Sequence, residues 1–252
     1  MHMRLLDVEV EKDGIGLLRR LYEEKVVTAL SGVKGCRFAG LIQSVSNPGR
    51  CLSLTLWDSP DDTAEYERSG LFGELIRESS VFFTKSIEYT IRLSEDLRVE
   101  YVPVSVEPVI QSYPIAAQSG TGKDARGLTS DLWVRIVSLK ILQGKMEEFK
   151  KLYRDHSIPA LRSAPGCLFV YLLDNEVNRD QVFSVTIWNK HEDALAYEKS
   201  GVFERLIELQ KGTLSGHAQE MLLTGGDDQS SSRGTGDILV EHFSILAGRS
   251  FA

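Results

Sequence analysis

Ser53-Leu54-Thr55-Leu56-Trp57 recurs 131 positions later in the chain as Ser184-Val185-Thr186-Ile187-Trp188. The same offset holds without a gap over a long stretch on both sides of this segment. It pairs Leu21-Tyr22 with Leu152-Tyr153, Gly35-Cys36 with Gly166-Cys167, Asn47 with Asn178, Tyr66-Glu67 with Tyr197-Glu198, and Phe72 with Phe203. Chance does not produce agreement over this length, so the chain is a tandem duplication.

The repeated segment has the period of two that is typical of a β-strand. The leucines at 52, 54 and 56 share one face, and Ser53, Thr55 and Trp57 share the other. An entirely apolar face indicates core. The repeated Ser-Thr-Trp face suggests a cavity wall that offers hydroxyl groups and an indole N–H to a flat aromatic ligand. The alternative is that Ser and Thr fit a tight barrel interior and Trp closes its end.

Each copy predicts the same order of elements, β-α-β-β-α-β. Strands are expected at 4–11, 36–45 and 51–57 and again at 132–142, 167–174 and 182–188, with an amphipathic helix after the first strand and a second helix after the third. Pro159 is expected to kink or split the first helix of the second copy. This order is the ferredoxin-like arrangement. We therefore predict an α+β fold in which two tandem ferredoxin-like modules pack sheet to sheet as an intramolecular pseudo-dimeric α+β barrel.

The predicted modules are residues 1–111 and 131–252. Residues 112–130 are rich in small side chains and are predicted to be the linker. The last strand of the first module is expected near 87–93, with an extended continuation to about residue 110. The last strand of the second module is expected near 217–224 and 238–246, with a mobile loop at 225–236.

The composition argues against several functional classes. The chain has 252 residues, a net charge of −7 and a pI near 5.4, and its basic residues form no cluster, so no nucleic-acid partner is expected. No apolar run approaches the roughly 18 residues of a membrane span. The three cysteines form no CxxC pair, which favours a reducing cytoplasm.

A family pattern is visible, most clearly in the second copy. It comprises PALRSAPGCLFVYLLD at 159–174, VTIWN at 185–189 and AYEKSGVF at 196–203. The Pro-Gly step into the second strand, the Trp that closes the third strand and the small-residue break before Phe203 resemble the antibiotic biosynthesis monooxygenase family. The resemblance covers both modules and most of the chain.

The resemblance implies a cofactor-independent monooxygenase that oxidises a small aromatic or quinol-like substrate with O2. The rival is a non-catalytic barrel that binds a small ligand or serves in assembly. Haem degradation is not expected. The haem-degrading branch of the family has an iron-ligating His where this chain has Ile76 and Ile207, and an Asn in the first strand, where this chain has none. Family members also often carry His where this chain has Tyr66 and Tyr197.

Activity is expected mainly in the second module, which keeps the family pattern better. The candidate catalytic residues are Trp188 to orient a substrate, Tyr197 to donate a hydrogen bond, and His156 to deprotonate a phenol near neutral pH. The candidate substrate-binding residues are Trp57, Tyr66, Ser184, Thr186, Phe169 and Tyr171. The alternatives are that the tyrosines pack against the sheet and that His156 is a surface histidine.

No cofactor or metal is expected. His191, His217 and His242 are separated by strands and loops, and no two have helical spacing. A Walker loop, a dinucleotide-binding glycine fingerprint and a nucleophile elbow are all absent from the sequence. The predicted partner is a small aromatic molecule, and whether the pseudo-dimer dimerises further is left open.

Overall fold

The computed structural model describes residues 1–84, 89–93, 99–103, 108–119, 131–215, 234–235 and 238–251. Both modules have the predicted β-α-β-β-α-β order. Module 1 contains β1 (His2–Glu9), α1 (Ile15–Leu21), α2 (Val27–Ser31), β2 (Cys36–Ser44), β3 (Arg50–Trp57), α3 (Pro60–Arg68), α4 (Leu71–Ser79) and β6 (Val109–Gln118). Module 2 contains β7 (Trp133–Lys140), α5 (Met146–Leu152), α6 (Ile158–Ser163), β8 (Cys167–Asp174), β9 (Gln181–Trp188), α7 (His191–Lys199), α8 (Val202–Gln210) and β11 (Ile238–Ser250).

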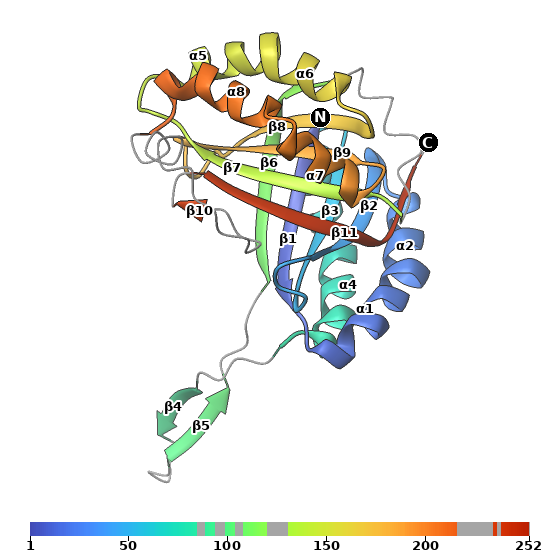
Figure 1. The fold of residues 1–252 in the computed structure, drawn as a ribbon. Helices are drawn as coiled ribbons and strands as arrows, with labels where there is room; N and C mark the ends of the chain where they lie inside the picture. The colour runs from blue at the N-terminus through green and yellow to red at the C-terminus, as the bar shows by residue number, and fades with distance from the viewer. Residues whose placement is uncertain are drawn as a thin grey trace.

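The strands of the two modules form one closed antiparallel barrel. Its order is β11-β2-β3-β1-β6-β8-β9-β7, and β7 pairs with β11 to close the ring. The last strand of each module joins the two halves: β6 pairs with β1 of its own module and with β8, and β11 pairs with β7 and with β2. The predicted pseudo-dimeric barrel is therefore confirmed (Figure 1).

The interior of the barrel is filled by the apolar faces of its strands. Leu54 and Leu56 of β3 belong to one buried cluster with Val185 and Ile187 of β9. The prediction that this face of the repeated segment is core is confirmed. The Ser-Thr-Trp face points outward instead, so the alternative that it lines the barrel interior is wrong.

The helices lie on the outside of the barrel in two groups, one for each module (Figure 1). Each group covers the outer face of the first three strands of its module and forms a separate buried cluster, which also includes a residue from the last strand of the other module, Ala247 of β11 or Ala117 of β6. Trp57 belongs to the module 1 cluster and Trp188 to the module 2 cluster. The described part of the chain therefore has three cores, one inside the barrel and one beneath each helical layer.

A π-helical turn interrupts the first helix of each module. It spans Tyr22–Val26 between α1 and α2, and Tyr153–Ser157 between α5 and α6. Pro159 lies in the first turn of α6, as a helix start allows. The helix is divided as predicted, but the same division occurs in module 1 without a proline, so Pro159 is not its cause. Turns of this kind are frequent at functional sites.

The end of module 1 differs from the prediction. The barrel strand is β6 at 109–118, whereas β4 (Tyr89–Leu93) pairs with β5 (Val99–Pro103) as a separate two-stranded sheet. Residues 112–118, predicted as linker, therefore belong to the sheet. In module 2, the strand predicted at 238–246 is confirmed within β11, and residues 217–224 lie outside the described part of the chain.

The start of the second helix has a side-chain cap in one module only. Ser59 is the N-cap of α3 and accepts a hydrogen bond from the backbone N–H of Asp62 at 3.2 Å. In module 2 the N-cap is Lys190, whose side chain makes no capping hydrogen bond. Within the described residues, no helix has the length and apolar character needed to cross a membrane.

Candidate ligand-binding cavity

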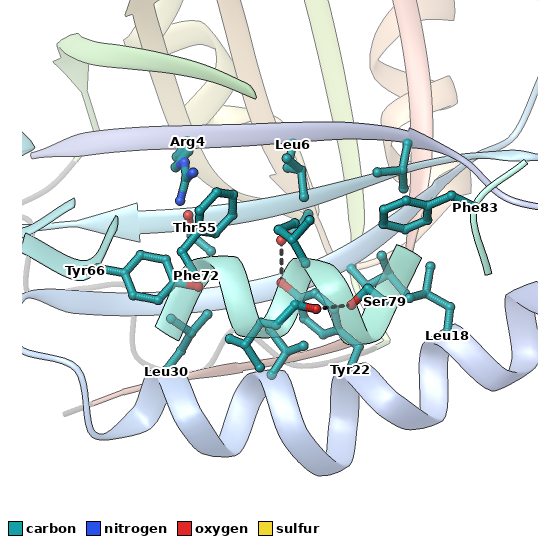
Figure 2. A pocket seen from close by; sticks show the side chains of 16 residues that line it. Arg4, Leu6, Leu18, Tyr22, Leu30, Thr55, Tyr66, Phe72, Ser79 and Phe83 are labelled. Carbon is teal, nitrogen blue, oxygen red and sulfur yellow. Dashed lines mark hydrogen bonds between the residues drawn. The ribbon is translucent and has the colours of Figure 1, made fainter. Parts of the chain in front are cut away.

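A cavity of about 50 Å³ lies in module 1, between the outer face of the sheet and the helical layer. Strands β1 and β3 form its wall on the barrel side, and the first helix and α4 cover it (Figure 2). Most of its lining is apolar. The polar lining residues are Arg4, Tyr22, Ser53, Thr55, Tyr66 and Ser79. Ser53 and Thr55 reach the cavity because alternate residues of β3 point away from the barrel interior.

Arg4 brings a positive charge to the wall of this cavity. Its side chain is 4% exposed, and Nη2 lies 2.9 Å from a carboxylate oxygen of Glu67. The guanidinium carbon also lies 4.0 Å from the ring centroid of Phe72. Nε has no hydrogen-bond partner among the described residues. Burial lowers the pKa of the Arg4 guanidinium from its ordinary value, an effect that Glu67 opposes, but arginine remains a cation in proteins.

A hydrogen-bonded pair of hydroxyl groups lies among the lining residues of the cavity. The Tyr22 hydroxyl lies 2.8 Å from the Ser53 hydroxyl, and the π-helical turn carries this tyrosine. Burial raises the pKa of the Tyr22 phenol far above its ordinary value. The phenol therefore stays protonated at neutral pH and can donate or accept a hydrogen bond.

Trp57 supports the cavity from behind. It is fully buried, its indole N–H donates to the Thr55 hydroxyl at 2.8 Å, and its ring stacks on Tyr66 at 5.2 Å. The indole N–H is thus already satisfied, and Trp57 is not among the lining residues. Tyr66 does line the cavity, together with Arg4 and Phe72 at the end where Figure 2 labels these residues.

Module 2 contains the matching constellation around a smaller cavity of about 20 Å³. Arg135 is 2% exposed and donates from Nε to Glu198 at 2.6 Å. The hydroxyl groups of Tyr153 and Ser184 lie 2.6 Å apart. Tyr197 also lines this cavity, and burial raises its pKa to about 12.

The structure brings only some of the predicted site residues together. Ser184 and Tyr197 line the module 2 cavity, whereas Trp188 is buried behind it and donates to Thr186 at 2.8 Å. Neither Thr186 nor Trp188 is a lining residue. In module 1, Tyr66 lines the cavity and Trp57 does not.

Three predicted residues lie elsewhere. Phe169 and Tyr171 face the barrel interior, on the opposite side of β8 from the helical layer, so they do not join Ser184. His156 is exposed on the π-helical turn and lines neither cavity. It fits the alternative of a surface histidine.

Sequence reasoning missed the arginines and the first-helix tyrosines. Arg4 and Arg135 are related by the repeat offset and interrupt otherwise apolar strands. A charged residue repeated at a buried strand position is a signal that could have identified them, because an arginine is almost never fully buried unless it is paired.

The histidines also differ from expectation. The rings of His191 and His242 lie 5.0 Å apart, and His191 stacks on Trp133 at 4.5 Å. These two histidines are therefore neighbours in space, although strands and loops separate them in the sequence. No group of three or more His, Cys, Asp or Glu residues in the described part of the chain is placed to hold a metal ion. Burial raises the pKa of the Cys36 thiol to about 12, which makes it a poor nucleophile.

Comparisons with known proteins agree with the fold. The sequence model described as antibiotic biosynthesis monooxygenase matches residues 1–78 and 133–209, well over half of the chain. No curated protein matches. A candidate monooxygenase from Lactobacillus acidophilus NCFM superposes with a TM-score of 0.63 at 9% identity, over 100% of this chain and 99% of the other.

Two further solved structures span nearly the whole chain. A candidate monooxygenase from Fusobacterium nucleatum subsp. nucleatum ATCC 25586 has a TM-score of 0.65 at 10% identity, covering 99% of this chain and 94% of the other. An anthrone oxidase-like protein has a TM-score of 0.55 at 11% identity, covering 99% and 93%. Identities this low show a common fold alone.

Proposed function

The chain belongs to the antibiotic biosynthesis monooxygenase family, and from this premise we propose that module 1 binds a small phenol or quinol and oxidises it with O2 without a bound cofactor. The observation that carries the proposal is Arg4. It is a buried cation on the wall of a mostly apolar cavity, and its Nε has no partner among the described residues. Such a site favours an aromatic ring that carries an anionic oxygen.

The guanidinium supports the chemistry by stabilising the anion. A phenolate is more electron-rich than a phenol and reduces O2 more readily, and a fixed positive charge in a site with little water lowers the free energy of the anionic form. Tyr22 and Tyr66 add hydroxyl groups that stay protonated, because burial raises the pKa of both phenols far above the ordinary value. They can donate hydrogen bonds to the substrate or to a reduced oxygen species.

The reaction balances without an external reductant. In hydroquinone, one atom of O2 enters a ring C–H bond as a hydroxyl group, the quinol becomes a quinone, and the second atom leaves as water. The substrate thus supplies all four electrons. One of the similar structures is named anthrone oxidase-like, and oxidation of an anthrone to an anthraquinone has the same balance.

The size of the cavity favours a single ring. An apolar cavity of about 150 Å³ binds benzene, whereas this one is about 50 Å³. Side chains must therefore move aside even for one ring, and three fused rings require a much larger displacement. We expect hydroquinone to be preferred over anthrone.

The test is oxygen uptake by metal-free protein with hydroquinone and with anthrone, together with the variants Arg4→Met and Arg135→Met. Losing a hydrogen bond to a charged group weakens binding by about 1.5–3 kcal/mol, so Arg4→Met should lower kcat/KM for uptake roughly 10- to 100-fold. Arg135→Met is the matched control and should lower it much less. Equal losses in both variants, or no uptake above the spontaneous rate, would contradict the proposal.

One observation favours a second candidate, which is ligand binding without turnover. The residues that line the module 1 cavity include no His, Asp, Glu or Lys, so no side chain there is suited to act as a general base. In the proposed reaction the substrate must therefore enter as an anion, and uptake should rise with pH as the quinol ionises. Saturable phenol binding that depends on Arg4, without oxygen uptake at any pH, would establish the binding function instead.

A further inference from the structure

The module 2 cavity retains the polar groups of the module 1 cavity. Arg135, Tyr153, Ser184 and Tyr197 occupy the positions of Arg4, Tyr22, Ser53 and Tyr66 at the 131-residue offset. The guanidinium of Arg135 still has one nitrogen, Nη2, with no hydrogen-bond partner among the described residues. What differs between the two modules is the space in front of these groups.

Larger side chains fill that space in module 2. Leu18, which lines the module 1 cavity, is replaced by Phe149, which is fully buried. Ser79, at the end of α4, is replaced by Gln210, at the end of α8. Leu18 and Ser79 lie toward the same end of the module 1 cavity (Figure 2), so both replacements act at one place.

A hydrogen bond fixes the side chain of Gln210 in the module 2 cavity. Gln210 donates from Nε2 to the hydroxyl of Ser157 at 2.6 Å, and both side chains are buried. The counterpart of Ser157 is Val26, which offers no acceptor. In module 1, the Ser79 hydroxyl donates instead to the carbonyl of Leu75 in its own helix at 2.8 Å, so it does not reach across the cavity.

We propose that module 2 is a closed copy of the ligand site, in which Phe149, Ser157 and Gln210 exclude the ligand, and that the protein binds one ligand per chain in module 1. The class of ligand rests on the function proposed above; the closure does not. The proposal therefore places activity in module 1, whereas the sequence analysis expected it mainly in module 2, which keeps the family pattern better.

Two variants exchange the filling residues between the modules. Phe149→Leu/Ser157→Val/Gln210→Ser opens module 2 with the residues of module 1. Leu18→Phe/Val26→Ser/Ser79→Gln closes module 1 with the residues of module 2. Both sets of side chains already pack within this fold, and far-ultraviolet circular dichroism checks that each variant folds. If the opening variant does not fold, Gln210→Ala replaces it.

Equilibrium dialysis with phenol counts the sites per chain. We expect one site in the unmodified protein, two in the opening variant and none in the closing variant. Two sites in the unmodified protein would overturn the proposal, as would one site in an opening variant that folds.

Xenon separates the closure from the ligand class. If phenol does not bind to the unmodified protein, the function proposed above is wrong, but the closure is still tested by crystals under xenon gas, which occupies empty apolar cavities. Xenon in module 1 alone, and in both modules of the opening variant, supports the closure. Xenon in module 2 of the unmodified protein, or its absence from module 2 of the opening variant, overturns it.

Discussion

Modules 1 and 2 have the same order of helices and strands and the same set of buried polar residues, but their cavities differ in volume. Each has a buried arginine, a tyrosine on a π-helical turn bonded to a strand serine, and a tryptophan that supports the wall. The cavity is about 50 Å³ in one and about 20 Å³ in the other. The comparison teaches that the volume of a cavity can differ between two copies of a module while its polar groups stay in place.

The largest expected effect concerns a residue that the two modules should use in the same way. Truncating a buried Trp to Ala costs about 3–5 kcal/mol because it leaves a large cavity. Trp57→Ala and Trp188→Ala should each lower the free energy of unfolding by an amount in this range, since both side chains are fully buried. Urea denaturation measures both losses. A small loss at one position would show that its Trp has a role other than packing.

The second prediction concerns a network present only in module 2. Glu198 accepts from Arg135 at 2.6 Å, and His242 Nε2 lies 3.2 Å from the same oxygen. Burial alone would raise the pKa of Glu198, but the hydrogen bond with His242 and the charge of Arg135 outweigh it and lower the pKa to about 2. In module 1, Glu67 contacts Arg4 and is 44% exposed.

The sign of the pH effect follows from this lowered pKa. The stabilisation by Glu198 is fully present above the unfolded-state pKa of about 4.3 and is lost as the pH falls through about 2. It amounts to the order of 3 kcal/mol. The difference in unfolding free energy between the unmodified protein and Glu198→Gln should therefore shrink between pH 5 and pH 2. Glu67→Gln is the control. If its difference in unfolding free energy from the unmodified protein changed equally with pH, the proposed distinction between Glu198 and Glu67 would be contradicted.

The smallest expected effect concerns the paired hydroxyl groups. Tyr153→Phe and Tyr22→Phe each remove one hydrogen bond to a serine, worth about 1 kcal/mol. The Tyr153–Ser184 pair is wholly buried, whereas the Tyr22–Ser53 pair is only partly so. Tyr153→Phe should therefore cost more, because water cannot reach the orphaned Ser184 hydroxyl. Thermal denaturation of both variants measures the difference. A larger loss of stability for Tyr22→Phe would contradict the inference that module 2 is the more tightly packed module.

The fold was largely predictable because the sequence patterns that predict each strand and helix occur twice in a duplicated chain. The alternation in β3 identified the barrel interior correctly, and the order of elements was sufficient to predict a closed barrel. The last strand of module 1 was not predictable in the same way. Residues 109–118 contain polar and small residues and a proline, and they form a strand because β1 and β8 offer hydrogen-bonding edges on either side.

The site was less predictable, since it depends on which residues meet across elements. Ser184 and Tyr197 were identified from the repeat. Phe169 and Tyr171 were predicted to line the same site, but alternate residues of a strand face opposite sides of the sheet, and these two face the barrel interior. The role of Arg4 depends on its burial beside Phe72 and Glu67, which the sequence does not display. The difference in volume between the modules depends on contacts of Gln210 that also become visible only in three dimensions.

The position of β6 and β11, each paired with a strand of both modules, has a consequence for how the protein unfolds. Each strand is bonded to both modules, so neither half can open without breaking the sheet of the other. The chain should therefore melt as one cooperative unit despite its two-part sequence. In such a unit module 2, which has the smaller cavity, stabilises module 1, which has the larger one, so one copy can lose packing density without unfolding by itself.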